Sequence, residues 1–301
     1  MLSAKVLPKI QGKYKKNINL GQLCWFKTTG FAEVLYIPSD IMDLENFLNN
    51  LNKTRIETSI YVIGAGSNLL VRDKGLEGIV IRLGSGFNYI NHYKSLVTVG
   101  ASVLDYHIAK YALKNSISGL EFLSGIPGTI GGGVKMNAGA YGYNISDILV
   151  SAKAINIFSG IKRVFRNHDF GYYYRGNALK DEWLFYEATL RGYPGNKIEI
   201  ESSMQEIQKS RLFSQPINSK TGGSTFKNPI NEQAWRLIDG CGLRGKKVGK
   251  AKFSELHPNF LINEGGASAS DLEALIKIAK QSVKKKYGVL LEEEIKIIGN
   301  E

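Results

Sequence analysis

Residues 125–142 of this chain read Gly125-Ile126-Pro127-Gly128-Thr129-Ile130-Gly131-Gly132-Gly133-Val134-Lys135-Met136-Asn137-Ala138-Gly139-Ala140-Tyr141-Gly142. Seven of these 18 residues are glycine, and small or apolar side chains stand between them. Ordering so much flexible backbone costs conformational entropy, and small side chains fill a core poorly. An irregular surface loop does not account for the interleaved apolar residues. We therefore expect a flat or anionic ligand, such as a ring cofactor or a pyrophosphate, to lie against this backbone.

A second glycine loop, Gly64-Ala65-Gly66-Ser67-Asn68, stands between the strand-like runs Ile60–Ile63 and Leu69–Val71. Its glycines can adopt positive φ and present backbone N–H groups to a phosphate, and its serine and asparagine can add hydrogen bonds. It is not the dinucleotide fingerprint G-x-G-x-x-G, because the third glycine is missing and no helix follows. From the residues alone, a phosphate-binding loop and a tight hairpin turn explain this segment equally well.

The surrounding sequence predicts a mixture of helices and strands. Apolar spacing predicts a helix over 41–51 with Asp40 as its N-cap, and an amphipathic helix over 103–114. A polar helix over 197–211 indicates a linker between a glycine-rich module, which ends near residue 212, and a smaller module. The other expected elements are strands at 59–63, 69–71, 78–83, 95–99, 151–158, 183–190 and 289–298, and helices at 232–239 and 269–287. Because strands and helices do not alternate regularly, we expect an α+β fold rather than a doubly wound parallel sheet.

Composition excludes several classes of protein. The chain has 301 residues with 43% hydrophobic and 22% charged residues, which is typical of globular domains and not of disorder. Its two cysteines, Cys24 and Cys241, are far apart, so neither a disulfide framework nor a structural zinc site is expected. No apolar run approaches the roughly 20 residues of a membrane span, and the N-terminus lacks the apolar core of a signal peptide. We therefore expect a cytoplasmic protein without membrane insertion.

Three further motifs carry polar groups, and each has an ordinary structural explanation beside a functional one. Tyr172-Tyr173-Tyr174-Arg175 offers a guanidinium that can grip a carboxylate or phosphate, or merely stack on the rings. Gly222–Pro229 gathers a hydroxyl, an ammonium and an amide behind two glycines, as a polar β-turn also would. Leu291–Ile297 is typical of a strand whose Glu292, Glu294 and Lys296 share a face, exposed by default. The four histidines show no ligand spacing, so we expect no metal.

Taken together, these segments resemble one family: the flavoprotein UDP-N-acetylenolpyruvoylglucosamine reductases (UDP-N-acetylmuramate dehydrogenases, the MurB family) of bacterial peptidoglycan synthesis. Residues 125–142 are the most specific part of the match, and the short chain looks like the compact second type of the family. The chain departs from the family at Thr29-Gly30, where a double glycine is usual, and at Asn177, where a serine is common. The matching segments follow the family's order and are Val62–Leu70, Gly119–Gly142, Arg175, Gly223–Pro229, Ser254–Asn263 and Leu291–Gly299.

The resemblance implies an α+β architecture with a two-lobed FAD-binding module of the vanillyl-alcohol-oxidase (PCMH) type and a smaller α+β substrate-binding domain. Residues 1–71 would form the first FAD-binding lobe, joined by the C-terminal strand at 290–301. Residues 72–212 would form the second lobe, and residues 213–289 the substrate-binding domain.

The resemblance also implies FAD as the cofactor. We expect it to be noncovalent, because neither glycine loop holds a histidine or cysteine that could tether it. The pyrophosphate would lie on the first loop and the isoalloxazine ring against the second. The expected FAD-binding residues are Gly64, Ala65, Gly66, Ser67, Asn68, Leu69, Gly125, Pro127, Gly128, Thr129, Gly131, Gly132, Asn137, Ala138, Gly139 and Ala140.

The implied reaction uses NADPH as the hydride donor and reduces the enolpyruvyl group of UDP-N-acetylglucosamine-enolpyruvate to give UDP-N-acetylmuramate. Negative charge develops beside the reacting carbon, and a fixed cationic donor such as Arg175 would stabilise it. Ser224 would then protonate the carbon, and Glu294 matches the family's acidic partner. The implied substrate contacts are Tyr174, Lys227, Asn228, His257 and Asn259.

The charge balance fits this interpretation, because FAD, NADPH and a UDP-sugar are all anionic and the chain carries a net charge of +12. Two rival hypotheses remain. One is an FAD-linked oxidase of the same fold that acts on an alcohol or sugar. The other is a basic nucleic-acid-binding module, for which no recognition helix or aromatic RNA-binding motif is present. We therefore expect small-molecule partners and no nucleic acid, and we favour a monomer.

Overall fold

The structure, a computed structural model, describes residues 7–54 and 58–301. Residues 1–6, which bear on the expected absence of a signal peptide, lie outside the described residues. The contacts divide the chain into two compact units. Unit 1 comprises the described residues of 1–16, 34–65 and 78–209, and unit 2 comprises residues 17–33, 66–77 and 210–301. Each unit gathers three separate stretches of sequence. The division into two lobes and a substrate domain stays a prediction.

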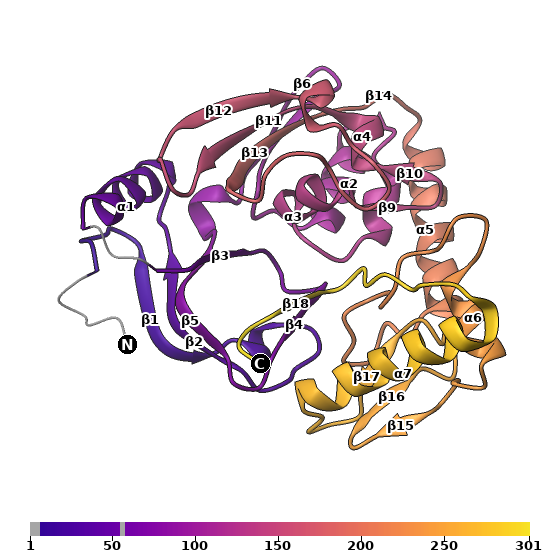
Figure 1. Ribbon diagram of the computed structural model, residues 1–301. Coiled ribbons are helices and arrows are strands. Elements are labelled where there is room, and N and C mark those ends of the chain that lie inside the picture. The colour runs from indigo at the N-terminus through magenta and orange to yellow at the C-terminus, as the bar shows by residue number, and fades with distance from the viewer. Residues whose placement is uncertain (1–6, 55–57) are drawn as a thin grey trace. The chain divides into compact units, whose positions relative to one another are not determined.

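The centre of unit 1 is an antiparallel sheet with the strand order β12-β11-β13-β7-β6 (Figure 1). The expected strands at 95–99, 151–158 and 183–190 are present as β7, β11 and β13. The segment between β11 and β13 also supplies the edge strand β12, which sequence patterning did not predict. The bounds are β6 Ile90–Tyr93, β7 Leu96–Gly100, β11 Leu149–Asn156, β12 Lys162–Arg166 and β13 Trp183–Arg191.

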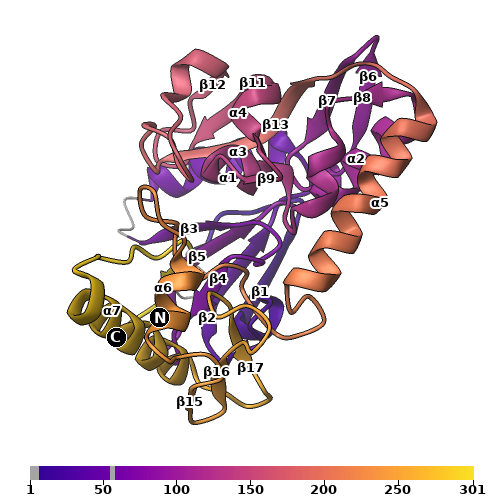
Figure 2. The same cartoon turned by 90° about the vertical axis from the view of Figure 1, so that its right-hand side faces the viewer.

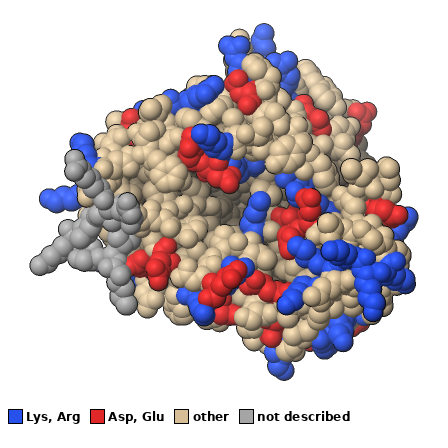
Figure 3. All heavy atoms as spheres, in the orientation of Figure 1, with Lys and Arg blue, Asp and Glu red and all other residues tan. Residues whose placement is uncertain are grey.

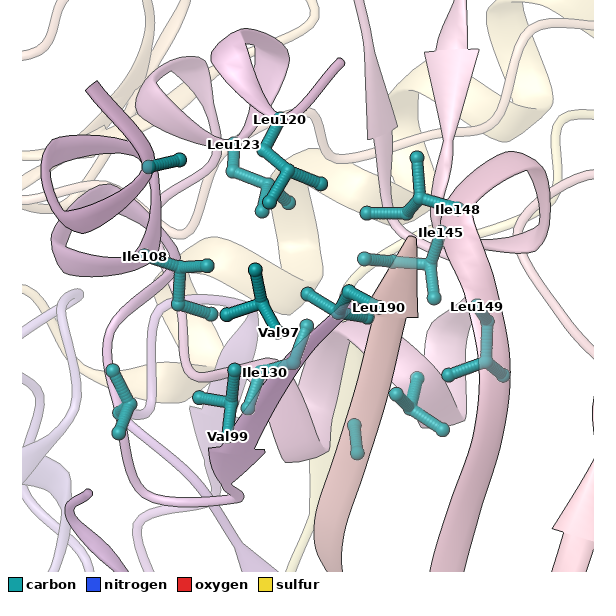
Figure 4. Close-up of a cluster of buried hydrophobic side chains, with 14 of the residues drawn as sticks. Val97, Val99, Ile108, Leu120, Leu123, Ile130, Ile145, Ile148, Leu149 and Leu190 are labelled. Atoms are coloured by element: carbon teal, nitrogen blue, oxygen red, sulfur yellow. The ribbon is translucent and has the colours of Figure 1, made fainter. Parts of the chain in front are cut away.

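Two helices cover this sheet and close its core. α3 (Ile130–Met136) packs on β7 and β13, and α2 (Asp105–Lys114) contributes apolar side chains to the same cluster. Figure 4 shows this cluster, in which Val97, Leu190 and Ile130 lie together although they come from distant parts of the chain. The core therefore fixes the start of α3, which lies inside the long glycine-rich segment.

A second core of unit 1 lies under α1 (Ile41–Lys53). The expected N-cap is confirmed, because the Asp40 carboxylate accepts a hydrogen bond from the Asp43 N–H group at 2.9 Å. Strand β3 (Ile60–Ile63) runs parallel to β5 (Leu76–Arg82) in a sheet of order β1-β2-β5-β3. β1 (Lys13–Asn19), β2 (Phe31–Ile37) and β5 each run from one unit into the other.

The polar helix predicted over 197–211 is α5 (Lys197–Ser214), a single uninterrupted helix in Figure 2. It buries only Ile200, Met204 and Ile207, and it continues from unit 1 into unit 2 at residue 210. The Tyr141 hydroxyl donates a hydrogen bond to the Ile207 carbonyl at 3.1 Å. The end of the glycine-rich segment is therefore attached to the helix that leaves unit 1.

In unit 2 a small antiparallel sheet, β15-β16-β17, packs against the long helix α7. α7 (Ala269–Tyr287) has the predicted bounds, because Ser268 and Asp271 form a capping box at its start and Gly288 is left-handed at its end. Its last turn carries Lys284, Lys285 and Lys286, which are exposed, and Lys and Arg atoms gather on this part of the surface in Figure 3. The other elements are α6 Ala234–Gly240, β15 Lys247–Val248, β16 Ala251–Phe253 and β17 Leu261–Asn263.

One expectation about strands is wrong, and one of the two alternatives for the loop at 64–68 is excluded. The segment 289–298 is a regular strand only at β18 (Lys296–Ile298), because the N–H groups of Glu294 and Ile295 both turn toward the Thr225 carbonyl. β18 pairs in parallel with β4 (Leu69–Val71), whereas β3 pairs with β5. The loop at 64–68 therefore joins strands of two different sheets and is not a hairpin turn.

The remaining elements are short. Among the described residues, no helix is long and apolar enough to cross a membrane. The short elements are η1 Gly21–Leu23, η2 Ser85–Phe87, β8 Ile117–Ser118, η3 Glu121–Gly125, β9 Gly139–Ala140, β10 Tyr143–Asn144, α4 Ile145–Ile148, η4 Asn167–Phe170 and β14 Tyr193–Pro194.

Candidate active site

The glycine-rich segment of unit 1 is mostly ordered as helix and short strand. Gly131, Gly132 and Gly133 lie in the first turns of α3, and the N–H group of Gly131 donates to the Ala101 carbonyl at 3.1 Å. A Cβ atom added at Gly131 would lie 2.9 Å from that of Ala101, so glycine is needed there for packing. At Gly132, by contrast, an added Cβ would meet only Thr129 Oγ1, at 3.8 Å. Gly132 therefore presents bare backbone to open space.

The two glycine loops meet in unit 1. A Cβ atom added at Gly64 would lie only 2.5 Å from Thr129 Oγ1, so the first loop begins directly against the second. Gly64, Thr129 and Gly132 together form a surface without bulky side chains. Such a surface is what a flat or phosphate-bearing cofactor requires for close approach to the backbone. The residues present thus fit FAD.

The later part of the segment turns back on itself. Asn137 ends α3 in the left-handed conformation, with φ 46°. Its side-chain Nδ2 donates to the Tyr173 carbonyl at 3.1 Å, and its Oδ1 accepts from the Ser146 N–H group at 2.9 Å. β9, which holds Gly139 and Ala140, pairs with β10. Asn137 therefore ties the glycine-rich segment to the tyrosine–arginine turn.

Arg175 lies in that tight turn and is itself left-handed, with φ 59°. Backbone hydrogen bonds between Tyr173 and Gly176, at 3.0 and 3.2 Å, close the turn. The half-buried guanidinium lies over the Tyr174 ring, 5.1 Å from its centroid. A non-glycine residue in this region is strained, and such strain concentrates at functional sites.

α3 also holds the turn that contains Arg175. The Tyr172 hydroxyl donates to the Val134 carbonyl at 3.0 Å, and the Asn177 side chain donates to the Lys135 carbonyl at 2.7 Å. The last turn of α3 thus positions Arg175 by binding Tyr172 on one side of the turn and Asn177 on the other. Asn177, the residue that departs from the family pattern, has this structural task.

In unit 2 the predicted residues Ser224 and Glu294 lie on adjoining backbone. The N–H group of Glu294 donates to the Thr225 carbonyl at 2.8 Å. Ser224 follows Gly223, which has φ 82°, and forms an isolated bridge with Phe260. Both Ser224 and Glu294 are half-buried. The hydroxyl and carboxyl groups thus come from segments about 70 residues apart in sequence.

Asn68 of the first glycine loop joins this group in unit 2. Its side-chain Nδ2 donates to the Glu294 carbonyl at 3.0 Å, and its own carbonyl accepts from the Lys296 N–H group at 2.9 Å. The loop is also held at Gly66, which has φ 70° and accepts a hydrogen bond from the Trp25 N–H group at 3.0 Å. Ser67 and Leu69 are buried beside them.

The three consecutive glutamates differ in their surroundings. Glu292 pairs with Lys227 at 3.4 Å, and Glu293 pairs with Lys280 at 2.8 Å. Glu294 is the one whose backbone contacts both Asn68 and Thr225. The structure therefore distinguishes Glu294 from its neighbours, which the spacing in the sequence does not.

Three of the predicted substrate contacts have structural tasks. The Asn259 amide donates to the Phe226 carbonyl at 2.8 Å and accepts from its N–H group at 3.0 Å. Asn228 Oδ1 accepts from the N–H group of Ala234, the first residue of α6, at 3.1 Å. Burial lowers the pKa of His257, whose Nδ1 accepts from the Asn259 N–H group at 3.3 Å. A direct contact of these residues with substrate stays a prediction.

Some residues that shape the site carry no signal in the sequence. The backbone of 101–103 accepts hydrogen bonds from Gly131 and Ile130, at 3.1 and 3.0 Å, and so fixes the start of α3.

Within the described part of the chain, no group of three or more His, Cys, Asp and Glu side chains could hold a metal ion. Arg175 belongs to unit 1 and Ser224 and Glu294 to unit 2. A joint role of the three residues in one reaction stays a prediction.

The glycine loops, which meet at Gly64 and Thr129, indicate an FAD-binding flavoprotein. Residues 32–160 match the family model described as "FAD binding domain". Residues 215–298 match a second model, described as "UDP-N-acetylenolpyruvoylglucosamine reductase, C-terminal domain".

Whole proteins named UDP-N-acetylenolpyruvoylglucosamine reductase are similar along nearly the entire chain. The one from Orientia tsutsugamushi (strain Boryong) is 47% identical over 297 residues, covering 97% of each chain. The one from Rickettsia typhi is 47% identical over 294 residues, covering 98% of each chain. The crystal structure of the Thermus caldophilus protein of that name has a TM-score of 0.80 at 31% identity, covering 96% of this chain and 99% of that one.

The chain therefore belongs to the UDP-N-acetylenolpyruvoylglucosamine reductase family. It is a flavoprotein oxidoreductase of cell-wall precursor synthesis. The predicted family, the α+β fold with its FAD-binding module and FAD as the cofactor are confirmed.

Proposed function

We propose that this protein uses NADPH to reduce the enolpyruvyl group of UDP-N-acetylglucosamine-enolpyruvate, giving UDP-N-acetylmuramate. The observation that carries the proposal is the placement of Ser224 and Glu294 on adjoining backbone, through the hydrogen bond of Glu294 to Thr225 at 2.8 Å. This backbone contact brings together the two segments that carry a hydroxyl and a carboxyl group, and either group can deliver a proton to carbon. The names of the similar proteins support the substrate.

FAD, when bound, would supply the hydride-transfer chemistry between NADPH and the methylene carbon of the enolpyruvyl ether. The chain would hold FAD along Gly64, Thr129 and Gly132. The two glycines leave the backbone bare there, and a Cβ atom added at Gly64 would collide with Thr129. Binding is noncovalent in this proposal, because neither glycine loop contains a histidine or cysteine.

Arg175 and Ser224 then act on the substrate. Negative charge develops at the carbon next to the one that receives hydride and spreads into the carboxylate. The planar guanidinium of Arg175, held by its strained turn, stabilises that carboxylate with two parallel hydrogen bonds. The Ser224 hydroxyl delivers a proton to the carbon.

Glu294 is the acidic partner on this side of the site. When protonated, it donates a hydrogen bond to the developing carboxylate. Lys227, whose ammonium is within 3.4 Å of Glu292, is placed near the same backbone and would bind the phosphate or sugar. Because nucleotide sugars and NADPH are cytoplasmic metabolites, we propose that the protein works in the cytoplasm. We also propose that it is a monomer.

An anaerobic titration tests the proposal. The purified yellow protein should be bleached by NADPH and should regain its colour when the enolpyruvyl nucleotide is added. Bleaching by an alcohol or a sugar without NADPH would instead establish the oxidase hypothesis. A protein that NADPH bleaches but the enolpyruvyl nucleotide does not recolour would contradict the proposed substrate.

A further inference from the structure

Asp105, the first residue of α2, is a buried carboxyl group that the proposed reaction does not use. The residue is 1% exposed. Among the described residues, neither of its carboxyl oxygens has a hydrogen-bond partner. A buried polar group without a partner is unfavourable, and a buried charge without one is far more so. Such a group needs an explanation.

Asp43 shows what a satisfied carboxylate looks like in the same unit. It is also near the start of its helix and is 3% exposed. Its two oxygens accept hydrogen bonds from the N–H groups of Gln11, Gly12 and Ser39, at 2.7, 2.9 and 3.0 Å. Asp105 has no such donors, although both residues are almost inaccessible to solvent. The two carboxyl groups therefore differ in their hydrogen-bond partners.

The backbone around Asp105 is paired with the glycine-rich segment. The Asp105 N–H group donates to the Gly128 carbonyl at 3.1 Å, and the Ile130 N–H group donates to the Val103 carbonyl at 3.0 Å. Between these bonds, Leu104 and Thr129 form an antiparallel bridge. This short ladder joins the start of α2 to residues 128–130.

The carboxyl group itself lies beneath α3. A Cβ atom added at Gly133 would lie 3.7 Å from Asp105 Oδ1, so the acid is within contact distance of the third glycine of α3. Val103, Ile108 and Val134, which lie on the same segments, are buried in the apolar core of this unit. Ile108 and Ile130 lie in this cluster in Figure 4.

No charge on the neighbouring elements compensates Asp105. Glu121 on η3 is held by Ser118 and the Gly119 N–H group, and Lys135 on α3 pairs with Asp181. The remaining charged or titratable groups on the elements around it are Tyr106, His107, Lys110, Tyr111 and Lys114 on α2, Asp147 on α4, and Tyr186, Glu187 and Arg191 on β13. Burial alone raises the pKa of Asp105, to about 8.

We propose that Asp105 is a positioning residue for the flavin-binding segment: as a neutral acid it allows the ladder and α3 to close over it, and its ionisation loosens them. Ionisation releases the proton to solvent and leaves a carboxylate that requires water or donors. Opening of the ladder between 103–105 and 128–130 would admit that water. Opening displaces Thr129 and α3, which hold the open surface assigned to FAD. The inference rests on that assignment under the proposed function.

The affinity for FAD alone tests the inference. The dissociation constant would be measured by flavin fluorescence between about pH 6.5 and about pH 9. In the wild-type protein we expect it to rise by up to about tenfold per pH unit once Asp105 ionises. Asp105→Asn, a neutral group of the same shape, should remove this rise. Asp43→Asn is the matched control and should keep it.

The outcomes separate the inference from the proposed reaction. A wild-type dissociation constant that does not change with pH, or an equal rise in Asp105→Asn, would overturn the inference. Because the assay needs neither NADPH nor the enolpyruvyl nucleotide, failure of the proposed substrate chemistry does not affect it. If Asp105→Asn does not fold, infrared spectra of the wild type replace it. A carbonyl band of a neutral carboxylic acid that disappears together with FAD affinity supports the inference, and its absence at neutral pH contradicts it.

Discussion

Ser224 is the residue on which the proposed protonation step depends. We expect Ser224→Ala to leave reduction of FAD by NADPH unchanged, because the hydroxyl has no part in that step. Reoxidation by the enolpyruvyl nucleotide should be slower by about 10²–10⁴-fold, the usual contribution of a general acid. Anaerobic stopped-flow absorbance measures both half-reactions separately. Ser282→Ala on α7 is the control, and equal reoxidation rates in the two variants would remove Ser224 from this role.

Arg175 offers a second test at the same scale, because the chain contains a matched arginine. Arg163 on β12 also lies over an aromatic ring, 4.6 Å from the centroid of Phe165. We expect Arg175→Lys to lower kcat/KM for the enolpyruvyl nucleotide by at least about 100-fold, since an ammonium cannot make two parallel hydrogen bonds. Arg163→Lys should leave it unchanged. Similar steady-state constants for both variants would show that Arg175 is only a surface stacking residue.

The roles of single amides could not be predicted from the sequence. Asn259 and Asn228 are of the right type for ligand contacts, and the sequence pattern suggests that use. In the structure Asn259 satisfies the backbone of Phe226, which lies 33 positions away, and Asn228 caps α6. Their partners are set by tertiary structure, which local patterns do not encode. The glycine loops were predictable because their lack of side chains is itself the signal.

At the scale of elements, local signals predict well only where the element is stabilised locally. α7 has its capping box, its apolar stripe and its left-handed glycine within its own sequence, and its predicted bounds are correct. The segment 289–298 has the alternation of a strand, but most of it is irregular, because the Glu294 and Ile295 N–H groups bond to Thr225. A competing backbone partner from a distant loop thus overrides the local pattern.

A substitution in the first turns of α3 should affect protein stability and cofactor binding in different ways. Gly132→Ala should keep or raise the stability of the flavin-free protein, by up to about 1 kcal/mol, because alanine favours helix and meets only Thr129 at 3.8 Å. FAD affinity should fall, because the methyl group enters the surface assigned to the cofactor. Urea unfolding and flavin fluorescence measure the two effects.

Gly133→Ala is the control in the same helix. An added Cβ there faces the core and would make only ordinary contacts, of 3.5 Å with Ile145 and 3.7 Å with Asp105 Oδ1. It should gain similar helix stability and keep FAD affinity. An equal loss of affinity in both variants, or in neither, would mean that Gly132 does not face FAD.

For the whole molecule, the net charge of +12 should speed the capture of anionic substrates. We expect kcat/KM for the enolpyruvyl nucleotide to fall by several-fold, roughly 3–10, as ionic strength rises from about 0.02 to about 0.2 M, since salt screens the attraction. The turnover number at saturation should change little. A salt series of initial rates measures both, and a kcat/KM that does not respond to salt contradicts electrostatic capture.

Two buried aspartates of unit 1 give the stability of the fold opposite dependences on pH. Burial raises the pKa of Asp43, but hydrogen bonds from the N–H groups of Gln11, Ser39 and Gly12 outweigh burial, so its pKa lies below the ordinary value. Its contribution is present above the unfolded pKa and is lost as pH falls through the folded one. Burial raises the pKa of Asp105 to about 8, so the folded state retains a proton that the unfolded state has lost.

The free energy of unfolding should therefore fall as pH rises between about 4 and about 8, by up to about 1.4 kcal/mol per pH unit from Asp105 alone. The reason is that, over this window, the folded state binds more protons than the unfolded state. Urea unfolding of the flavin-free protein across this range measures the slope. In Asp105→Asn the slope should be reduced by nearly this amount, whereas Asp43→Asn should lower stability without changing it. A wild-type slope equal to that of Asp105→Asn would show that Asp105 is ionised in the folded protein, and would require a donor to it that the described residues do not supply.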